Sequence, residues 1–572
     1  MSDELKHECG IAMIRLLKPL EYYQEKYGTS LYGLNKMYLL MQKQVNRGQD
    51  GADLANIKLD VKPGKRYISR YRSNKVNSVQ DVFTYINKKF EDIEEKHPGK
   101  IQDVQWLKEN TAFSGELFLG HLRYGTYGGN SIEHCHPFLR QNNWMTRNLV
   151  LAGNFNMTNV DELFNQLIEL GQHPKEKSDT VTILEKIGHF LDEENSHLYH
   201  ANKDEIKDKQ EMSKFLATHI DVREVLVNSA KKWDGGYVMC GLMGHGDAFA
   251  LRDPAGIRPG FYYKDKEIVV VASERAVIQT AMNVPEETIS EITPGHALII
   301  KKDGRISMDQ VTEPLENKAC SFERIYFSRG NDSDIYNERK NLGKLISPKI
   351  MKNIDGDLKN SVFSFIPNTA ETAFYGLLSS LEDELNDQRK RALNTNNLDD
   401  LNRLIGQKIR VEKMAVKDAK LRTFITADND RDGLVGHVYD VTYGIAKPTD
   451  TLVILDDSIV RGTTLKKSIL RILDRLKLKK IIVVSSAPQI RYPDCYGIDM
   501  ARLGDFIAFK AVMSLLNKTK KGKDTIDATY QKCKEALKKP KEKQKNYLKN
   551  IYAPFTELEI SNQIASLLRT DN

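Results

Sequence analysis

The stretch Thr451–Thr464, TLVILDDSIVRGTT, decides the fold of the second half of the chain. A short apolar run, Leu452–Leu455, ends in two carboxylates, Asp456 and Asp457, and a polar turn follows. An amphipathic segment then runs from about Leu465 to Leu478. This order predicts a buried parallel strand followed by a crossover helix in an α/β sheet. Because ligands of such sheets bind beyond the carboxyl ends of the strands, the turn is the predicted binding loop.

The residues of this turn suit a sugar phosphate. Gly462 lets the backbone approach a ligand closely, and Ser458, Thr463 and Thr464 offer hydroxyls. Free amides at the start of a helix favour an anion. Two adjacent carboxylates can accept hydrogen bonds from the hydroxyls of a ribose, or help to hold Mg²⁺. A lone acidic pair is more often a solvated, capped turn, so the prediction depends on the strand, the pair and the Arg-Gly-Thr-Thr run occurring together.

Length and composition indicate a folded protein with at least two domains. The chain has 572 residues, too many for one ordinary core, and its 40% hydrophobic and 28% charged residues are typical of a soluble globular protein. No apolar stretch approaches the roughly 20 residues of a membrane span. The charged start, MSDELKHE, lacks the apolar region of a secretory signal. We therefore expect a cytoplasmic protein with no membrane partner.

The net charge of +7 is concentrated in the Lys-rich stretch between Lys518 and Lys549. That stretch lacks the dense aromatic interleaving of a nucleic-acid stacking platform. A solvated helical face with Glu–Lys pairs explains it better, so we predict no nucleic-acid partner.

The front half of the chain carries a second group of motifs. Cys9 lies in HECGIAMI, ahead of a short apolar strand, and RGQDGAD follows at residues 47–53. GHLRYGTYG places Arg123 beside a tight turn, GNFNMTN (153–159) leaves a strand, and Asp179 begins a helical stretch. Each has an ordinary structural interpretation alone: a cysteine there is usually a small core residue, and Arg123 or Asp179 a surface salt bridge.

In this order, the front motifs resemble the class II glutamine amidotransferase domain. The segment 451–464 resembles the phosphoribosylpyrophosphate (PRPP) motif of type I phosphoribosyltransferases. Together they resemble the glutamine PRPP amidotransferase family, whose members begin purine synthesis. Further matches lie between the two ends, and the resemblance covers about residues 9–511: ALRDPAGIRPG (250–260), VASERA (271–276), CSFERIYFSRG (320–330), RTFI (422–425) and RYPDCYGIDM (491–500).

The resemblance implies a fold class and a domain order. Residues 9–312 would form an α+β N-terminal-nucleophile domain, an αββα sandwich of two antiparallel sheets between helical layers. Residues 313–511 would form an α/β type I phosphoribosyltransferase domain with a charged insertion near 379–420. Residues 1–8 would be a propeptide, and residues 512–572 a basic helical tail.

The resemblance also assigns residues of the glutamine site. Cys9 would become residue 1, because in this family its own α-amine, which titrates near about pH 8, is the base for its thiol. Arg123 would pair with the α-carboxylate of glutamine, and Asp179 would hold its ammonium. The Asn154 side chain and the Phe155 backbone amide would donate to the oxyanion. Phe155 stands where the family usually has glycine, so its side chain restricts this loop.

In the second half, the resemblance places Asp456 and Asp457 at the ribose and at Mg²⁺. Residues 458–464 would cradle the 5′-phosphate, and the loop Ile366–Thr372 would receive the pyrophosphate. The predicted PRPP-binding set is therefore Asp456, Asp457, Ser458, Val460, Arg461, Gly462, Thr463 and Thr464.

Three other segments depart from the family pattern. HCHPF (134–138) replaces an Asn- or Gln-bearing sequence, and VKDAKL (416–421) lacks the Asn-Arg-Tyr of the loop that closes on PRPP. Residues 426–450 are unlike their family counterpart. Since loop closure organises such a site, these changes bear on the coupling of the two reactions more than on glutamine binding.

The cysteines do not fit the [4Fe–4S] cluster that some family members hold. Cys320 matches one cluster position and Cys495 lies one residue from another, but the closing Cys-x-x-Cys pair is missing and only Cys533 remains. We therefore predict no iron–sulfur cluster. The acidic pair and the family resemblance imply Mg²⁺ as the cofactor.

Three functions remain open from the sequence. The first is an amidophosphoribosyltransferase that uses glutamine and PRPP, is inhibited by purine nucleotides and forms a homodimer or homotetramer, as the family does. The second keeps the amidotransferase half but delivers ammonia elsewhere, as in aminosugar synthases and asparagine synthetases, and the PRPP motif argues against it. The third is a paralogue that binds PRPP or nucleotide as a regulator with little turnover.

Overall fold

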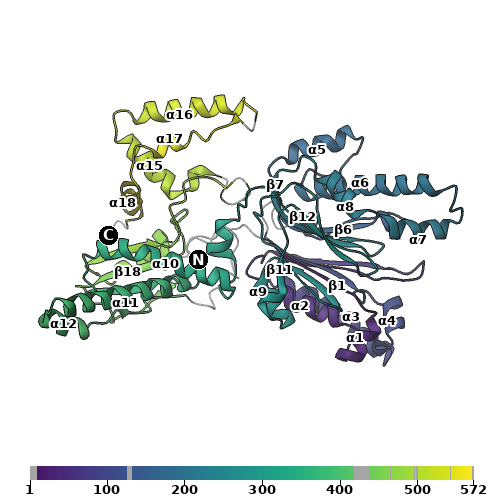
Figure 1. The fold of residues 1–572 in the computed structure, drawn as a ribbon, viewed down its shortest axis with the longest axis horizontal. Helices are drawn as coiled ribbons and strands as arrows, with labels where there is room; N and C mark the ends of the chain where they lie inside the picture. The colour runs from purple at the N-terminus through teal and green to yellow at the C-terminus, as the bar shows by residue number, and fades with distance from the viewer. Residues whose placement is uncertain are drawn as a thin grey trace. The chain divides into compact units, whose positions relative to one another are not determined.

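The computed structural model describes residues 9–124, 132–417, 439–463, 465–494, 496, 500, 502–540 and 543–569, and it contains two compact units (Figure 1). The N-terminal unit runs from Cys9 to Glu323 and includes Tyr496, and the C-terminal unit holds the other described residues from Arg324 onward. Several predicted features lie outside the described residues: the propeptide 1–8, RTFI, residues 426–438, Thr464 and Cys495.

Two antiparallel sheets form the centre of the N-terminal unit. The first has seven strands in the order β11 (Ile289–Glu291), β9 (Phe261–Lys264), β10 (Ile268–Ala272), β1 (Gly10–Leu16), β4 (Leu117–Arg123), β2 (Gly51–Ile57) and β3 (Ile68–Ser73). The second has six, in the order β13 (Ile306–Gln310), β12 (His296–Ile300), β8 (Ala248–Arg252), β7 (Gly235–Met243), β6 (Leu149–Met157) and β5 (Phe138–Arg140).

Alternation along β1 explains why this strand is almost continuously apolar. Ile11 and Met13 lie in the core between the sheets, together with Val150 of the second sheet. Ala12 and Ile14 belong to the core on the opposite face, under the helices. Successive side chains of a strand point to opposite faces, so a strand covered on both sides buries every position.

Helices cover the outer face of each sheet (Figure 1). One layer lies on the first sheet: α1 (Leu20–Tyr27), α2 (Tyr32–Lys43), α3 (Ser78–Lys96), α4 (Val104–Asn110) and α9 (Arg275–Met282). The other lies on the second: α5 (Val160–Glu169), α6 (Asp179–Asn202), α7 (Lys209–His219) and α8 (Val222–Ala230). The predicted αββα sandwich is confirmed.

A parallel four-stranded sheet forms the centre of the C-terminal unit. Its order is β15 (Arg410–Val411), β14 (Ser361–Phe365), β18 (Thr451–Asp456) and β19 (Lys480–Ser485). A separate pair joins β16 (Ala415–Lys417) to β17 (Tyr439–Val441). The predicted buried parallel strand is therefore β18, whose residues Leu452–Leu455 are at most 1% exposed.

The helix after β18 is shorter than predicted. A π-type segment, η6 (Leu465–Leu470), continues into α14 (Arg471–Asp474), and helical structure stops four residues before Leu478. The N–H of Lys477 bonds to the carbonyl of Asp474, and Lys477 itself has a positive φ of 47°. The chain therefore turns here toward β19.

Two glycines bring α10 (Ser333–Asn353) and α11 (Glu371–Asn394) into backbone contact. A Cβ on Gly343 would lie 1.7 Å from the carbonyl oxygen of Ala373, and one on Gly376 would lie 1.9 Å from that of Lys340. No side chain fits at either position, so the two helices pack as closely as backbones allow. Helix α12 (Leu398–Ile405) follows α11 at the edge of this unit.

Four further helices lie in the described part of the C-terminal unit: α15 (Ile507–Asn517), α16 (Gly522–Leu537), α17 (Lys549–Tyr552) and α18 (Glu557–Leu568). Ile507 and Leu568 join the apolar cluster of β18 and η6, which also contains Leu452 and Leu465. The end of α18 is therefore part of the sheet's core. Within the described residues, no helix is long and apolar enough to cross a membrane.

Candidate active site

Cys9 lies immediately before β1 and is partly buried. Its Sγ accepts a hydrogen bond from the backbone N–H of Tyr124 at 3.5 Å. Burial raises the pKa of the Cys9 thiol to about 11, although the Tyr124 amide, Arg123 and Arg47 lower it. At that pKa only about one thiol in ten thousand is ionised at pH 7. A nucleophilic Cys9 therefore needs a base beside it.

Arg47 connects four motif segments that are far apart in the sequence. It is fully buried, and its Nε donates to the carbonyl oxygen of Cys9 at 3.3 Å. Its Nη1 bonds to Glu274 at 3.2 Å, and its Nη2 pairs with Glu323. Burial lowers the pKa of Arg47, but the two carboxylates outweigh burial and raise it. The guanidinium thus stays charged and fixes the backbone of Cys9.

Arg123 and Asp179 both influence the pKa of the Cys9 thiol through their charges. Arg123 ends β4, is 4% exposed and lowers the pKa of Cys9, while Asp179 raises it. Asp179 is the first residue of α6, whose N-cap Ser178 accepts a hydrogen bond from Val181 N. One cationic and one anionic side chain are therefore close enough to the thiol to influence its charge.

Burial raises the pKa of Asp179 to about 6, against hydrogen bonds from Thr180 and from its own backbone N–H that lower it. The bonds from Thr180 are donated by its N–H at 2.7 Å and by its hydroxyl at 3.3 Å. Asp179 is consequently ionised near neutral pH but protonated in mild acid, because desolvation disfavours its charge.

Asn154 and Phe155 lie in β6, at the end of the strand that leaves the sheet core. Asn154 is 3% exposed and pairs in register with Val238 of β7. The ring of Phe155 covers Gly153, because a Cβ on Gly153 would lie 2.4 Å from Phe155 Cδ1. The side chain that departs from the family pattern thus fills space over its own strand.

Three residues beside this site were not predicted from the sequence: His121, His136 and Thr180. His121 and His136 stack with ring centroids 4.3 Å apart, and His136 bonds to Thr180. In the sequence, HCHPF stands out only as a departure from the family pattern, and no periodicity indicates that His136 meets a residue of β4.

The predicted PRPP loops follow neighbouring parallel strands of the C-terminal unit. Phe365 at the end of β14 pairs with Leu455 of β18, so the loop Ile366–Thr372 and Asp457 leave the same edge of the sheet. Gly330 also lies here, since its Cβ would be 3.7 Å from Thr372 Oγ1. This edge is where ligands of open parallel sheets bind.

Hydrogen bonds within the acidic turn, and from the residues after β19, hold the turn in place. Asp457 N donates to Asp456 Oδ1 at 2.9 Å, and Ser458 Oγ donates to Asp457 Oδ1 at 3.0 Å. Ser486 N and Ala487 N, after β19, donate to the carbonyls of Asp456 and Asp457 at 2.9 and 3.0 Å. No sequence pattern indicates that the loop after β19 supports the turn.

The rest of the phosphate loop is anchored by the C-terminal helices. Val460 is buried, and its carbonyl accepts from Ile507 N at 2.8 Å. Gly462 has a φ of 70°, Arg461 is half-buried and Thr463 is exposed.

The acidic turn fits a divalent cation that also binds a substrate. Asp456 and Asp457 are 1% and 4% exposed, and burial raises the pKa of Asp457, so a cation would stabilise the ionised pair. Within the described ranges, no group of three or more His, Cys, Asp or Glu side chains is arranged to hold a metal ion. Mg²⁺ commonly uses one or two carboxylates together with substrate phosphates, and this donor set matches that arrangement.

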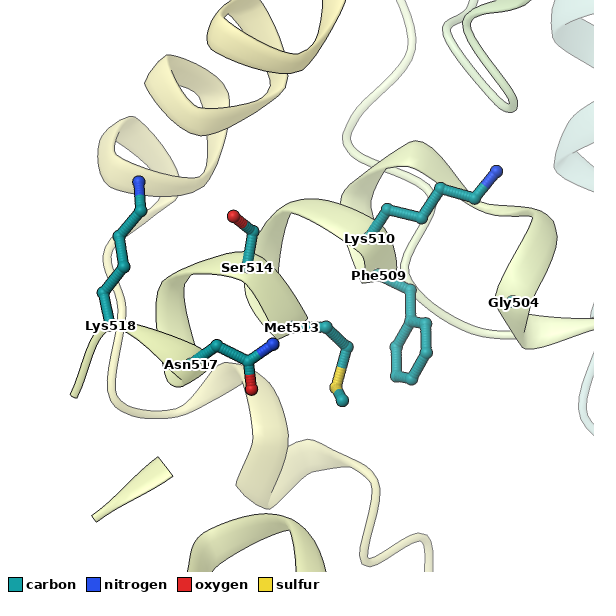
Figure 2. A pocket seen from close by; sticks show the side chains of 7 residues that line it. All are labelled: Gly504, Phe509, Lys510, Met513, Ser514, Asn517 and Lys518. Carbon is teal, nitrogen blue, oxygen red and sulfur yellow. The ribbon is translucent and has the colours of Figure 1, made fainter. Parts of the chain in front are cut away.

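A groove on the C-terminal helices contains none of the predicted site residues (Figure 2). Its volume is about 620 Å³, and it lies along α15. Its lining residues are Gly504, Phe509, Lys510, Met513, Ser514, Asn517 and Lys518.

Sequence comparison finds curated relatives that are named amidophosphoribosyltransferase. An amidophosphoribosyltransferase from Pasteurella multocida is 27% identical over 476 residues, which cover 81% of this chain and 78% of that protein. The Escherichia coli amidophosphoribosyltransferase is 27% identical over 425 residues, 72% of this chain and 74% of its own. The chain is a diverged relative of the amidophosphoribosyltransferases. No family model matches it.

Solved structures of amidophosphoribosyltransferases share the fold. The Bacillus subtilis glutamine PRPP amidotransferase, solved with ADP and GMP, covers 89% of this chain and 89% of its own, with a TM-score of 0.59 and 22% identity. A structure described as the allosteric regulatory enzyme of purine biosynthesis has the same TM-score, with 23% identity over 87% and 85% of the two chains. The fold is therefore an N-terminal-nucleophile sandwich plus a type I phosphoribosyltransferase domain.

Proposed function

We propose that the protein is a glutamine-dependent amidophosphoribosyltransferase, which makes 5-phosphoribosylamine, glutamate and pyrophosphate from PRPP, glutamine and water. One observation carries this proposal: a partly buried thiol within the electrostatic influence of Arg123 and Asp179 occurs in the same chain as an acidic turn after a parallel strand. The proposal is also supported by relatives that are named amidophosphoribosyltransferase and that match this chain over most of its length and most of theirs.

In the N-terminal unit, glutamine would be held by its α-carboxylate on Arg123 and by its ammonium on Asp179. The Cys9 sulfur attacks the carboxamide carbon, and its proton goes to the α-amine that removal of residues 1–8 would free. Asn154 and the Phe155 amide donate to the oxyanion. The α-ammonium returns this proton to the departing nitrogen, so ammonia leaves and a thioester to Cys9 remains. Water then hydrolyses the thioester, which releases glutamate and restores the thiol.

In the C-terminal unit, ammonia attacks the anomeric carbon of PRPP and pyrophosphate departs. Asp456 and Asp457 would orient the ribose hydroxyls, and the loop containing Gly462 would bind the 5′-phosphate through its amides. The loop Ile366–Thr372 would receive the pyrophosphate. Mg²⁺, held by the two carboxylates and the substrate, would supply charge stabilisation for the departing group.

The finer assignments form part of the same proposal. Domains would span residues 9–312 and 313–511, close to the change of compact unit between Glu323 and Arg324. A homodimer or homotetramer inhibited by purine nucleotides follows from the family resemblance. The absence of an iron–sulfur cluster follows from the missing Cys-x-x-Cys pair, and a cytoplasmic location from the composition and the charged start of the sequence.

Pyrophosphate release tests the proposal. The assay contains PRPP and Mg²⁺ with either glutamine or ammonium salt at alkaline pH, for the wild type and for Cys9→Ala. We expect Cys9→Ala to abolish glutamine-dependent release and to retain ammonium-dependent release. Binding of PRPP without release from either nitrogen source would instead support the regulatory paralogue.

A further inference from the structure

The edge of β6 beside the glutamine site is completed by two imidazoles. Strand β5 pairs with β6 only from Phe138 onward, where Phe138 meets Leu151. Pro137, just before it, has no N–H to donate. The next position of β6 on that edge is Gly153, whose backbone N–H and C=O point to the same side.

His136 and His121 bind the two polar groups of Gly153. The N–H of Gly153 donates to His136 Nδ1 at 3.4 Å, and its carbonyl oxygen lies 3.2 Å from His121 Nε2. The backbone on both sides of Gly153 is thus fixed by side chains. The next residue is Asn154, so the imidazoles orient the peptide that presents the oxyanion donor.

The same contacts set the tautomer of each ring. His136 Nδ1 accepts a hydrogen bond from the N–H of Gly153, so this nitrogen carries no proton. The proton of the neutral ring is therefore on Nε2, which donates to Thr180 Oγ1 at 2.9 Å. His121 Nε2 faces a carbonyl and carries the proton, which agrees with a buried Nδ1 that has no partner in the described residues.

Both rings are neutral near physiological pH. Burial lowers the pKa of His121 to about 3, and Arg123 lowers it further. Burial, His121 and Arg123 hold the pKa of His136 well below its ordinary value. Neutral rings can stack at 4.3 Å with planes 16° apart, whereas two charged rings would repel.

A directed line of hydrogen bonds therefore crosses the site. Gly153 N–H donates to His136, His136 Nε2–H donates to Thr180, and the Thr180 hydroxyl donates to Asp179 Oδ1 at 3.3 Å. The line ends on the carboxylate that would hold the substrate ammonium. Thr180 is 4% exposed, so water has little access to this link.

We infer that His136 is a positioning residue for glutamine: through Gly153 it orients Asn154, and through Thr180 it orients Asp179. The inference rests on the proposed glutaminase function and adds a residue to it. The imidazole sets the distance between the place where the carboxamide reacts and the place where the ammonium binds. It touches no substrate and transfers no proton.

Comparing kcat/KM for two substrates distinguishes a positioning role of His136 from a general structural role. Glutamine has the α-ammonium that Asp179 would bind, and glutaramate is the same amide without the α-amino group. Thr180→Val keeps the shape and the Thr180 N–H bond to Asp179 but removes the hydroxyl. We expect kcat/KM for glutamine to fall about 10-fold, and kcat/KM for glutaramate to stay within about twofold.

His136→Leu removes both links. We expect kcat/KM to fall for both amides, because Asn154 shifts, and to fall about 10- to 100-fold for glutamine. His136→Gln is the matched control, since its amide can accept from Gly153 and donate to Thr180. It should keep both kcat/KM values within about threefold of wild type. Ammonium-dependent pyrophosphate release serves as a measure of folding and should not change.

Each result decides between outcomes. If His136→Leu and Thr180→Val keep the wild-type ratio of the two amides, His136 does not position Asp179. If His136→Gln is as impaired as His136→Leu, the hydrogen bonds are not the cause. If His136→Leu does not fold, Thr180→Val carries the test alone. If the wild type itself releases no glutamate from glutamine, the proposed function fails and the role of His136 fails with it.

Discussion

Leu568 lies directly against Gly462. A Cβ added to Gly462 would approach Leu568 Cδ2 at 2.8 Å, and Lys466 Nζ in the following turn donates to the carbonyl of Leu567 at 2.9 Å. The last helix of the chain therefore supports the loop that would bind the 5′-phosphate. Leu568 is 5% exposed, so this contact is part of the core.

Replacing Leu568 by alanine should weaken PRPP binding without affecting the glutamine site. Loss of a buried leucine costs about 2–5 kcal/mol of unfolding free energy, and the cavity would loosen the loop at Gly462. We expect KM for PRPP to rise several-fold with ammonium as nitrogen donor, while glutamine hydrolysis is unchanged. Leu558→Ala, at a position of the same helix that is 63% exposed, is the control and should change neither quantity.

Gly462→Ala should be more damaging than its size suggests. The φ of 70° disfavours any side chain, and the new methyl would press on Leu568. We expect ammonium-dependent pyrophosphate release at subsaturating PRPP to fall at least about 10-fold. Gly504→Ala has no atom within 4 Å of its Cβ and should behave as wild type. Equal activity of the two variants would contradict this role of Gly462.

Glutamine use should weaken as the pH falls through about 6. Since burial raises the pKa of Asp179 to about 6, acid protonates the carboxylate that would bind the ammonium. We expect kcat/KM for glutamine to drop on this acid limb, measured as glutamate release between pH 5 and 8. This limb near pH 6 should be absent for glutaramate, which has no ammonium for Asp179 to bind, whereas a loss of activity below about pH 8 from protonation of the Cys9 α-amine should be common to both amides.

The same shift should make Asp179 a destabilising residue at neutral pH. Its folded pKa is raised above the unfolded value of 3.8, so the unfolded chain loses its proton first as the pH rises. Stability therefore falls between about pH 4 and 6 and stays lower above that range. Asp179→Asn should gain more in Tm at pH 8 than at pH 5, and an equal gain at both would contradict the shift.

Arg47→Met should destabilise the N-terminal unit strongly. It would leave Glu274 and Glu323 as buried carboxylates without their cation, which typically costs about 3–5 kcal/mol. Urea unfolding measures the loss. Arg324→Met breaks the exposed pair with Glu338 and should cost at most about 1 kcal/mol. A small effect at Arg47 would mean that the carboxylates find other donors.

Local pattern in the sequence predicted β18 and the turn after it, because an apolar run of strand length followed by carboxylates has few other solutions. It also predicted the sandwich, through motifs whose order resembles a known fold. The helix after β18 was predicted to end near Leu478, but the turn at Lys477 stops helical structure at Asp474. Apolar periodicity continues past that point, so it could not mark the end.

Contacts between distant segments could not be predicted in this way. His136 meets Thr180, and Gly462 meets Leu568, across 44 and 106 residues of chain respectively. Such pairs follow from how strands and helices are assembled, whereas periodicity reports only which face of one element is buried. HCHPF was recognisable as unusual, but its purpose depends on the strand edge that it completes.

The glycine contact between α10 and α11 has a mechanical consequence. Helices that touch through Gly343 and Gly376 cannot slide past each other without a backbone collision, so they move together as one rigid body. Arg339 in α10 links this helix pair to the segment before it, because its guanidinium donates hydrogen bonds to the carbonyls of Arg324 and Ser328 at 2.9 and 2.8 Å. Helix α11 begins within the loop Ile366–Thr372. Any displacement of the segment 324–328 would thus be transmitted to that loop rather than absorbed between the helices.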